Sequence, residues 1–352
     1  MIVEENKPLA PFTTLGIGGP ARWFIEAIGE EDVSLAAAWA RARGIKLFVL
    51  GGGSNLLIAD RGFDGLVLHI ALRGISVSET SAGAAQRTFA AAAGEDWDGF
   101  VERTVGENCA GLECLAGIPG TVGGTPVQNV GAYGQEVASA IERVRAFDLA
   151  QCTFVEFSAA ECGFAYRRSR FNSTDRDRYV VTRVDYRLTH GSAPTLRYAD
   201  LQRAFASDAQ PSLAEVAAVV RRVRQTKGML LVEGDPDCRS AGSFFKNPVA
   251  AEDHVRHIAK SSAKEPPRFP AGPGTENQGC VKVPAAWLIE QAGFAKGYAR
   301  GAAGISSRHT LALINRGGAT AHDIVALADM IASAVEEQFG IRLEMEPVKL
   351  GF

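Results

Sequence analysis

The apolar residues of the first 75 positions form short runs of strand length around one helical pattern. Ala21–Ala27 and Lys46–Leu50 are apolar-rich runs, and Gly65–Ile70 is a third. Val33–Arg43 has the spacing of an amphipathic helix, and three acidic residues before it suit the positive end of a helix dipole. Gly44 stands where a helix is expected to end. This part therefore predicts strand, helix, strand, loop and strand.

The middle of the chain continues with strands and one more helix. Thr88–Ala93 is strand-like and Trp97–Val105 has helical spacing. Ile141–Asp148 and Tyr179–Leu188 are further strand-like runs, and the second alternates well between apolar and polar residues.

The last third contains the clearest helices. Ser212–Thr226 is amphipathic and opens with a serine and a glutamate at capping-box spacing. Ala285–Ala292 is helical, and Ala321–Phe339 is the longest helical pattern, ended by Gly340. The remaining expectations are strands at Thr310–Ile314 and Ile341–Gly351 and a surface loop at Lys264–Gln278.

These elements predict the fold class. Strands and helices alternate, but several hairpin-like pairs interrupt the alternation. The pattern therefore favours an α+β fold with a mixed sheet over a doubly wound parallel sheet. A length of 352 residues suggests two or three domains.

The composition of the chain departs from the average mainly in its high glycine content. It makes up 38 of 352 residues, and the stretch Gly117–Gly134 is especially rich in it without being charged. Glycine allows close backbone approach and positive φ angles, so a long apolar glycine loop beside Gln128 and Asn129 suggests a backbone wrapped around a ligand. A pair of tight turns is the alternative.

A second glycine loop strengthens the ligand interpretation. The apolar run Lys46–Leu50 leads into Gly51–Asn55, where successive amides could form an anion nest for a diphosphate. It is not a Walker loop, because no Lys-Ser/Thr pair follows, and an ordinary β-turn remains the alternative. Together the two loops indicate an extended, phosphate-bearing cofactor.

Composition excludes several other classes. The chain is 46% hydrophobic and 22% charged with a net charge of −3, so it has no general affinity for nucleic acid. The N-terminus lacks the features of a secretory signal, and no apolar run approaches ~20 residues, so membrane insertion is not expected. The six cysteines show no metal-binding spacing, which is typical of reduced thiols in a cytoplasmic protein.

Five motifs occur in the order of one known family. They are Leu50–Leu57 (LGGGSNLL), Gly117–Gly134 (GIPGTVGGTPVQNVGAYG), Phe164–Phe171 (FAYRRSRF), Gly242–Pro248 (GSFFKNP) and Leu343–Val348 (LEMEPV). From about Pro11 to Gly351 the chain closely resembles the UDP-N-acetylenolpyruvoylglucosamine reductase family. The first two motifs also occur loosely in other flavoproteins of the vanillyl-alcohol-oxidase type.

The resemblance implies a fold, a cofactor and domains. It implies a two-subdomain FAD-binding fold of the vanillyl-alcohol-oxidase type followed by an α+β substrate-binding domain. The expected boundaries are 1–75, 76–210 and 211–352, with the last strand able to return to the FAD-binding part. Non-covalent FAD would contact Gly51, Gly52, Gly53, Ser54, Asn55, Ile118, Pro119, Gly120, Gly123, Asn129, Gly131, Ala132 and Tyr133.

The resemblance also implies a reaction. NADPH would reduce FAD, and the reduced flavin would deliver hydride to C3 of the enolpyruvyl group of UDP-N-acetylglucosamine enolpyruvate. Arg167 would pair with the substrate carboxylate, since its fork matches a carboxylate. Ser243 would give the proton to C2, and Glu346 would polarise the carboxylate. Glu344 competes with Glu346, because residues two apart in a strand share a face.

Four more residues are implied to bind the substrate. They are Tyr166, Tyr198 of a mobile flap, Lys227 for the diphosphate, and Asn247. Taken alone, each has an ordinary structural alternative, such as a half-buried strand tyrosine or a basic helix end. The Tyr198 segment places the chain in the flap-containing subtype, and a monomer is expected.

Two other functions stay open from the sequence. One is a different flavin-dependent oxidase or dehydrogenase of the same fold, and the other is a ligand-binding protein without activity. The trio Arg167, Ser243 and Glu346 favours the reductase, because a generic oxidase does not need it.

Overall fold

The chain folds into two compact units, each assembled from separate segments. The structure is a computed structural model that describes residues 1–79, 85–205, 210–261, 264–271 and 278–352. Unit 1 comprises Met1–Lys7, Ala21–Gly53 and Phe63–Gln225, and unit 2 comprises Pro8–Pro20, Ser54–Gly62 and Thr226–Phe352. The boundaries expected at residues 75 and 210 stay a prediction.

Unit 1 begins with a four-stranded sheet. Its order is β1 (Glu4–Pro8), β2 (Pro20–Ala27), β5 (Phe63–Ile70) and β3 (Leu47–Leu50), and β2 and β3 both run parallel to β5. Helix α1 (Glu30–Ala42) connects β2 to β3 and buries Val33, Ala36 and Ala40. Gly44 follows with a φ of 62°, so the expected helix end is confirmed.

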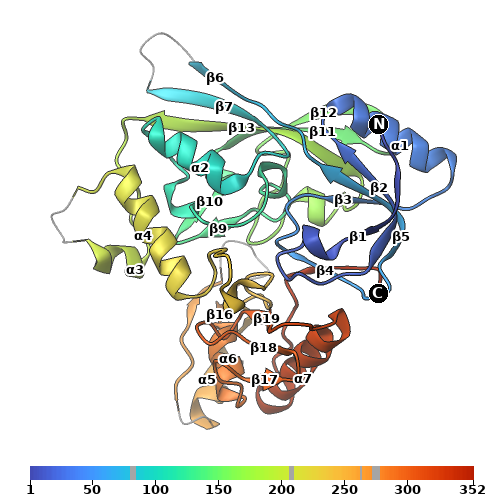
Figure 1. Ribbon diagram of the computed structural model, residues 1–352. Helices are drawn as coiled ribbons and strands as arrows, with labels where there is room; N and C mark the ends of the chain where they lie inside the picture. The colour runs from blue at the N-terminus through green and yellow to red at the C-terminus, as the bar shows by residue number, and fades with distance from the viewer. Residues whose placement is uncertain (80–84, 206–209, 262–263, 272–277) are drawn as a thin grey trace. The chain divides into compact units, whose positions relative to one another are not determined.

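Unit 1 also contains a larger antiparallel sheet (Figure 1). Its order is β12 (Thr153–Ser158), β11 (Ile141–Asp148), β13 (Tyr179–His190), β7 (Gln86–Ala92) and β6 (Ile75–Glu79), with β8 (Cys109–Ala110) also on β13. The expected strands at 88–93, 141–148 and 179–188 are confirmed. The edge strands β6 and β12 escaped sequence reasoning, because they are mostly exposed and lack a clear apolar face.

Helices and short strands complete unit 1 around an aromatic core. They are α2 (Trp97–Gly106), β9 (Gly131–Ala132), β10 (Gln135–Glu136), α3 (Ala199–Ala204) and α4 (Leu213–Thr226). Trp97 and Phe100 of α2 pack on Tyr186, with ring centroids 5.9 and 5.0 Å away. The Tyr186 hydroxyl shares a 2.7 Å hydrogen bond with Thr125. Two of the expected helices, 97–105 and 212–226, are thereby confirmed.

Unit 2 is built around the long helix α7 (Ala321–Phe339), whose bounds match the sequence prediction. Its remaining elements are β4 (Leu56–Ile58), β14 (Val249–Ala251), α5 (Glu252–Ser261), β15 (Phe269–Pro270), β16 (Cys280–Lys282), α6 (Ala285–Gln291), β17 (Ala299–Arg300), β18 (Ala303–Ile305), β19 (Leu313–Asn315) and β20 (Val348–Leu350). Helix α5 was not expected. Residues 272–277 of the expected surface loop lie outside the described residues.

The expected continuous last strand, 341–351, was wrong. Only β20 is regular, and it pairs in parallel with β4. Upstream of it, Met345 forms a single bridge with Phe245. Pro347 stands between the two pairings, and a proline cannot donate to a strand ladder. The expected strand 310–314 begins only at Leu313, because His309–Ala312 forms a hydrogen-bonded turn.

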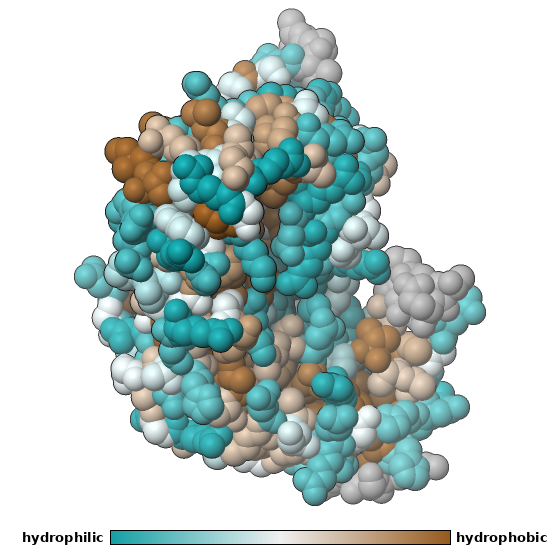
Figure 2. Space-filling model, turned by 90° about the vertical axis from the view of Figure 1, so that its right-hand side faces the viewer, coloured by the Kyte–Doolittle hydropathy of each residue, from teal (hydrophilic) through white to brown (hydrophobic). Residues whose placement is uncertain are grey.

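The surface is polar over most of the face that Figure 2 shows, with apolar side chains in a few separate groups. Within the described ranges, no helix has both the length and the hydropathy that a membrane span requires.

Helix α7 offers a test of unit 2 stability. Thr320 and Asp323 form a reciprocal capping box, with the Thr320 Oγ1 accepting from the Asp323 amide at 3.1 Å. Thr320→Ala should therefore lower the free energy of unfolding by about 1 kcal/mol. Urea denaturation followed by circular dichroism measures this, and Thr320→Ser should retain most of the stability. An unchanged midpoint in the alanine variant would mean that the cap contributes nothing.

Candidate functional site

The two glycine loops meet backbone to backbone in unit 1. A Cβ atom built on Gly52 would lie 2.6 Å from the Cα of Gly120, and one on Gly51 would lie 2.8 Å from the Thr121 Oγ1. Real side chains do not tolerate such distances, so the contact requires glycine. Strand β3 delivers the first loop to this contact, and Gly53 turns away with a φ of 59°.

The second loop is fixed at its beginning by charged side chains. The Gly117 amide donates to Asp98 Oδ1 at 2.6 Å, and the Gly117 carbonyl accepts from Arg224 Nε at 2.8 Å. Asp98 is also paired with Arg221 at 2.8 Å. Helices α2 and α4 thus hold this loop from two sides.

Further along, strand β7 and its continuation set the path of the loop. The Gly123 amide donates to the Ala93 carbonyl at 2.8 Å, and a Cβ on Gly123 would lie 2.6 Å from the Ala93 Cβ. The Gly120 carbonyl accepts from the Trp97 amide at 3.1 Å. These backbone hydrogen bonds of the loop therefore fix the path of the loop itself.

Arg167 lies in a tight turn that is bound to the same loop. The amide of Ala165 donates to the carbonyl of Arg168 at 2.9 Å, and Arg167 has a φ of 54°. Its Nη2 donates to the Gly131 carbonyl at 3.0 Å, while Asn129 Nδ2 donates to the Ala165 carbonyl at 3.0 Å. The structure thus brings Tyr166 and Arg167 beside two residues predicted to bind the cofactor.

Tyr133 and Tyr198 also meet in unit 1. Their rings are perpendicular with centroids 5.4 Å apart, and Tyr198 is 41% exposed. Residues expected to bind cofactor and substrate are therefore in direct contact here.

Arg224 is a functional candidate that sequence reasoning missed. It is buried, and that burial lowers the pKa of its guanidinium, while the neighbouring Tyr133 and Asp98 act in the opposite direction. Its position continues the buried stripe of α4, which runs through Leu213, Val216, Ala217 and Val220. A charged residue on an apolar helical face was the signal that could have identified it.

In unit 2, Ser243 and Glu346 lie on two segments that face each other. The Glu346 amide donates to the Phe244 carbonyl at 2.9 Å, and the Lys246 amide donates to the Glu344 carbonyl at 2.9 Å. Phe244 and Phe245 are buried with ring centroids 5.5 Å apart, which anchors the backbone beside Ser243.

The same geometry separates the two glutamates that the sequence left in competition. Glu344 is 72% exposed at its side chain and forms a 2.5 Å ion pair with Lys246. Glu346 is half-buried, two residues further along. Glu344 is therefore the exposed carboxylate of the two, and Glu346 is the more sheltered one.

Asn247 and Lys227 are also placed in unit 2. Asn247 Oδ1 accepts from the Ala285 amide at 2.9 Å, at the start of α6. Gly228, directly after Lys227, turns with a φ of 65°, and a Cβ there would lie 3.1 Å from the Asp237 Cβ and 3.2 Å from Arg308 Nε. This packing determines the backbone direction beside Lys227.

The predicted site residues divide between the units. Unit 1 holds Tyr166, Arg167, Tyr198, Gly51, Gly52, Gly53, Ile118, Pro119, Gly120, Gly123, Asn129, Gly131, Ala132 and Tyr133, and unit 2 holds Ser54, Asn55, Lys227, Ser243, Asn247 and Glu346. Asn55 lies close to the Glu346 segment, since its Nδ2 donates to the Glu346 carbonyl at 3.3 Å.

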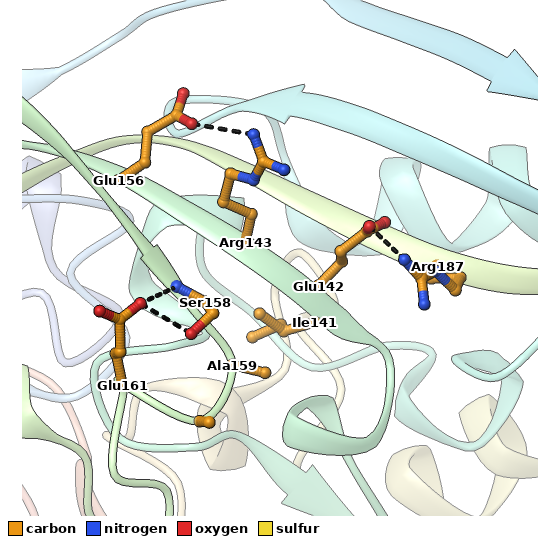
Figure 3. A pocket seen from close by; sticks show the side chains of 9 residues that line it. Ile141, Glu142, Arg143, Glu156, Ser158, Ala159, Glu161 and Arg187 are labelled. Carbon is orange, nitrogen blue, oxygen red and sulfur yellow. Dashed lines mark hydrogen bonds and ion pairs between the residues drawn. The ribbon is translucent and has the colours of Figure 1, made fainter. Parts of the chain in front are cut away.

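A separate depression lies at the β11–β12 hairpin (Figure 3). None of the predicted site residues lines it. Its charged groups pair with one another: Arg143 with Glu156 at 3.0 Å, Arg187 with Glu142, and the Glu161 carboxylate with Ser158 at 2.7 Å. Because these charged groups are already paired with one another, we do not interpret the depression as a ligand site.

Comparison with known proteins decides the family. The C-terminal domain model of UDP-N-acetylenolpyruvoylglucosamine reductase matches residues 235–350, and an FAD-binding domain model matches residues 22–158. The reductase of Streptomyces coelicolor is 47% identical over 99% of this chain and 90% of its own length. The chain belongs to the UDP-N-acetylenolpyruvoylglucosamine reductase family.

Other members of the reductase family are similar to this chain over nearly its full length. The reductase of Thermobifida fusca is 45% identical over 99% of this chain and 98% of its own length. The crystal structure of the reductase from Thermus caldophilus superposes with a TM-score of 0.65 at 27% identity, covering 99% of both chains. The expected fold class and an FAD-binding domain are confirmed, and the chain is an oxidoreductase of this family.

Gly52→Ala should weaken FAD binding by at least about tenfold. The new Cβ would collide with the Gly120 backbone, which cannot move aside as a flexible side chain would, so the two loops would separate. Flavin content after purification and titration of the apoprotein with FAD measure the effect. Gly29→Ala is the matched control, because a Cβ there meets no atom within 4 Å. Unaltered FAD affinity in Gly52→Ala would show that the contact is not needed.

Proposed function

We propose that this chain reduces the enolpyruvyl group of UDP-N-acetylglucosamine enolpyruvate, which yields UDP-N-acetylmuramate for peptidoglycan precursors. NADPH is the proposed electron donor and FAD the mediator. The observation that carries the proposal is near-full-length similarity to reductases of this name, at up to 47% identity.

The geometry of the glycine loops fits a flavin dinucleotide. Gly52 lies against the Gly120 backbone and Gly51 against Thr121 Oγ1, and neither glycine carries a side chain that would keep a diphosphate away from the loop amides. Ser54 and Asn55 would extend the diphosphate contacts, and the residues from Ile118 to Tyr133 would line the diphosphate and the ring system. When bound, the flavin supplies hydride transfer, which amino-acid side chains cannot perform.

The state of the cysteine nearest in sequence to the second loop is consistent with a flavin that is not covalently bound. Cys114 is buried, and burial raises the pKa of its thiol to about 12. The thiol therefore stays protonated at neutral pH and is a poor nucleophile for a covalent flavin link.

Arg167 would bind the substrate carboxylate. Its turn is fastened to the flavin loop through Gly131 and Asn129, which limits its freedom before the substrate arrives. A guanidinium offers two parallel donors to a carboxylate, and this pairing stabilises negative charge that develops during reduction at the adjacent carbon. Tyr166, the preceding residue of the same turn, would contact the substrate beside it.

Ser243 and Glu346 would complete the reaction on the substrate. Ser243 Oγ would deliver a proton to C2 after hydride reaches C3. A serine hydroxyl is a weak acid, so this role needs polarisation by the surrounding groups. Glu346 would interact with the carboxylate from the segment paired to Phe244 and Phe245.

Lys227, Asn247 and Tyr198 would hold the sugar nucleotide. An ammonium group is a suitable point charge for the diphosphate, and Asn247 can donate through its amide nitrogen. Tyr198 would close over the substrate from the segment before α3. We further propose that the protein is a monomer and that it is cytoplasmic, the second because UDP-sugar substrates and NADPH are cytoplasmic metabolites.

Replacing Ser243 should separate the two half-reactions. Ser243→Ala should leave flavin reduction by NADPH within about twofold of the wild type, but slow reoxidation by the enolpyruvyl sugar nucleotide by about 100-fold or more. Stopped-flow absorbance of the flavin measures each step. Equal losses in both half-reactions would contradict the proton-donor role. A wild-type protein that oxidises NADPH no faster with the sugar nucleotide than without it would sink the proposed function.

The two glutamates provide a matched pair. Glu346→Gln should reduce kcat by about 100-fold, because it removes the charge proposed to act on the substrate carboxylate. Glu344→Gln should change kcat by less than about threefold, since it loses only an exposed ion pair with Lys246. Steady-state kinetics with both variants distinguishes them, and the reverse order of effects would reassign the catalytic glutamate to Glu344.

A further inference from the structure

A buried glutamate lies directly before the second glycine loop and has no part in the function described above. Glu113 is 1% exposed, although carboxylates are seldom fully buried without partners. Its Oε2 accepts from the Gly111 amide at 2.8 Å, and its Oε1 accepts from Gln135 Nε2 at 3.2 Å. The same Oε1 accepts from the Thr195 amide at 3.3 Å.

The bond to Thr195 joins two stretches that are far apart in the chain. Cys114, next to Glu113, approaches the Thr195 carbonyl through its Sγ at 3.7 Å. Its amide donates to Gln135 Oε1 at 2.9 Å, so Gln135 links Glu113 and Cys114 in one small network. Both backbone groups of Thr195 therefore face residues 113–114.

The contacts continue from Thr195 toward Tyr198. Gly134 packs against Arg197 so closely that a Cβ on Gly134 would lie 3.1 Å from the Arg197 Cβ. Tyr133 then meets the Tyr198 ring at 5.4 Å. Residues 195–198 thus lie along residues 133–135, and Glu113 binds both stretches at one end.

We propose that Glu113 is a positioning residue for Tyr198. Its carboxylate holds Thr195 and Gln135 together and so places the segment Thr195–Tyr198 against the flavin-binding loop. An acceptor with two oxygens is needed here, since three N–H donors converge on it. The consequence for substrate binding rests on the proposed function, in which Tyr198 contacts the sugar nucleotide.

Two variants interrupt this anchor in different ways. Glu113→Gln keeps the shape but turns an amide NH₂ group toward at least one of the three donors. Thr195→Pro leaves Glu113 in place and removes the N–H that it accepts from the segment. Ala193→Pro is the matched control, because it adds a proline to the same stretch and no described residue accepts a hydrogen bond from the Ala193 amide.

The first readout needs no turnover. In the FAD-loaded protein without substrate, hydrogen exchange of a peptide covering residues 196–205 should become about tenfold faster in Glu113→Gln and Thr195→Pro. Exchange within β11 and β13 should stay unchanged, which separates a local release from general destabilisation. Unchanged exchange of residues 196–205 in Thr195→Pro would overturn the proposal, whatever the assay of the reaction shows.

The second readout tests whether Glu113 acts through Tyr198. Glu113→Gln should raise KM for the enolpyruvyl sugar nucleotide about tenfold with kcat within about twofold. In a Tyr198→Ala background the same change should raise KM by less than about twofold, because the residue through which it acts is gone. A full KM increase in that background would overturn the proposal. Failure of the wild type to reduce the sugar nucleotide would refute the proposed function and leave the exchange result standing.

Discussion

The close contact between Gly52 and Gly120 is the constraint on which the rest of unit 1 depends. The two backbones can approach to this distance only because Gly52 carries no Cβ. Strand β3 must end at the contact, and the second loop must be held against it by Asp98, Arg224 and the β7 end. Glycine is therefore a steric requirement at Gly52, and likewise at Gly123, where a Cβ would lie 2.6 Å from the Ala93 Cβ.

The same loop organises the residues that would act on the substrate. Its later part accepts a hydrogen bond from Arg167 through Gly131 and contacts Tyr198 through Tyr133. Residues proposed to bind the cofactor and residues proposed to bind the substrate therefore share one hydrogen-bonded and packed network. Such sharing limits the freedom of both sets before ligands bind, which is how a protein prepares a site for its transition state.

Unit 2 presents its proposed catalytic residues differently. Ser243 and Glu346 lie on short segments that are joined by a single bridge, made of two backbone hydrogen bonds, rather than on long strands. The buried Phe244 and Phe245 supply the rigidity that a regular sheet would otherwise provide. Pro347 explains why the last segment is not one strand. Within this segment Glu344 is exposed and Glu346 is half-buried.

The sequence by itself determined the elements with strong local signals. Helix α7 was predicted to its last residue, because the helical pattern and Gly340 agree, and β11 was predicted from its strand-like pattern. The motifs likewise identified the family and the residues proposed for its site. Only the tertiary structure decided which glutamate is sheltered, that Arg224 and Glu113 are buried beside the glycine loop, and that Tyr133 meets Tyr198. Those features depend on contacts between residues far apart in the chain, such as Arg224 and Gly117, which are 107 positions apart, and local periodicity holds no information about such pairs.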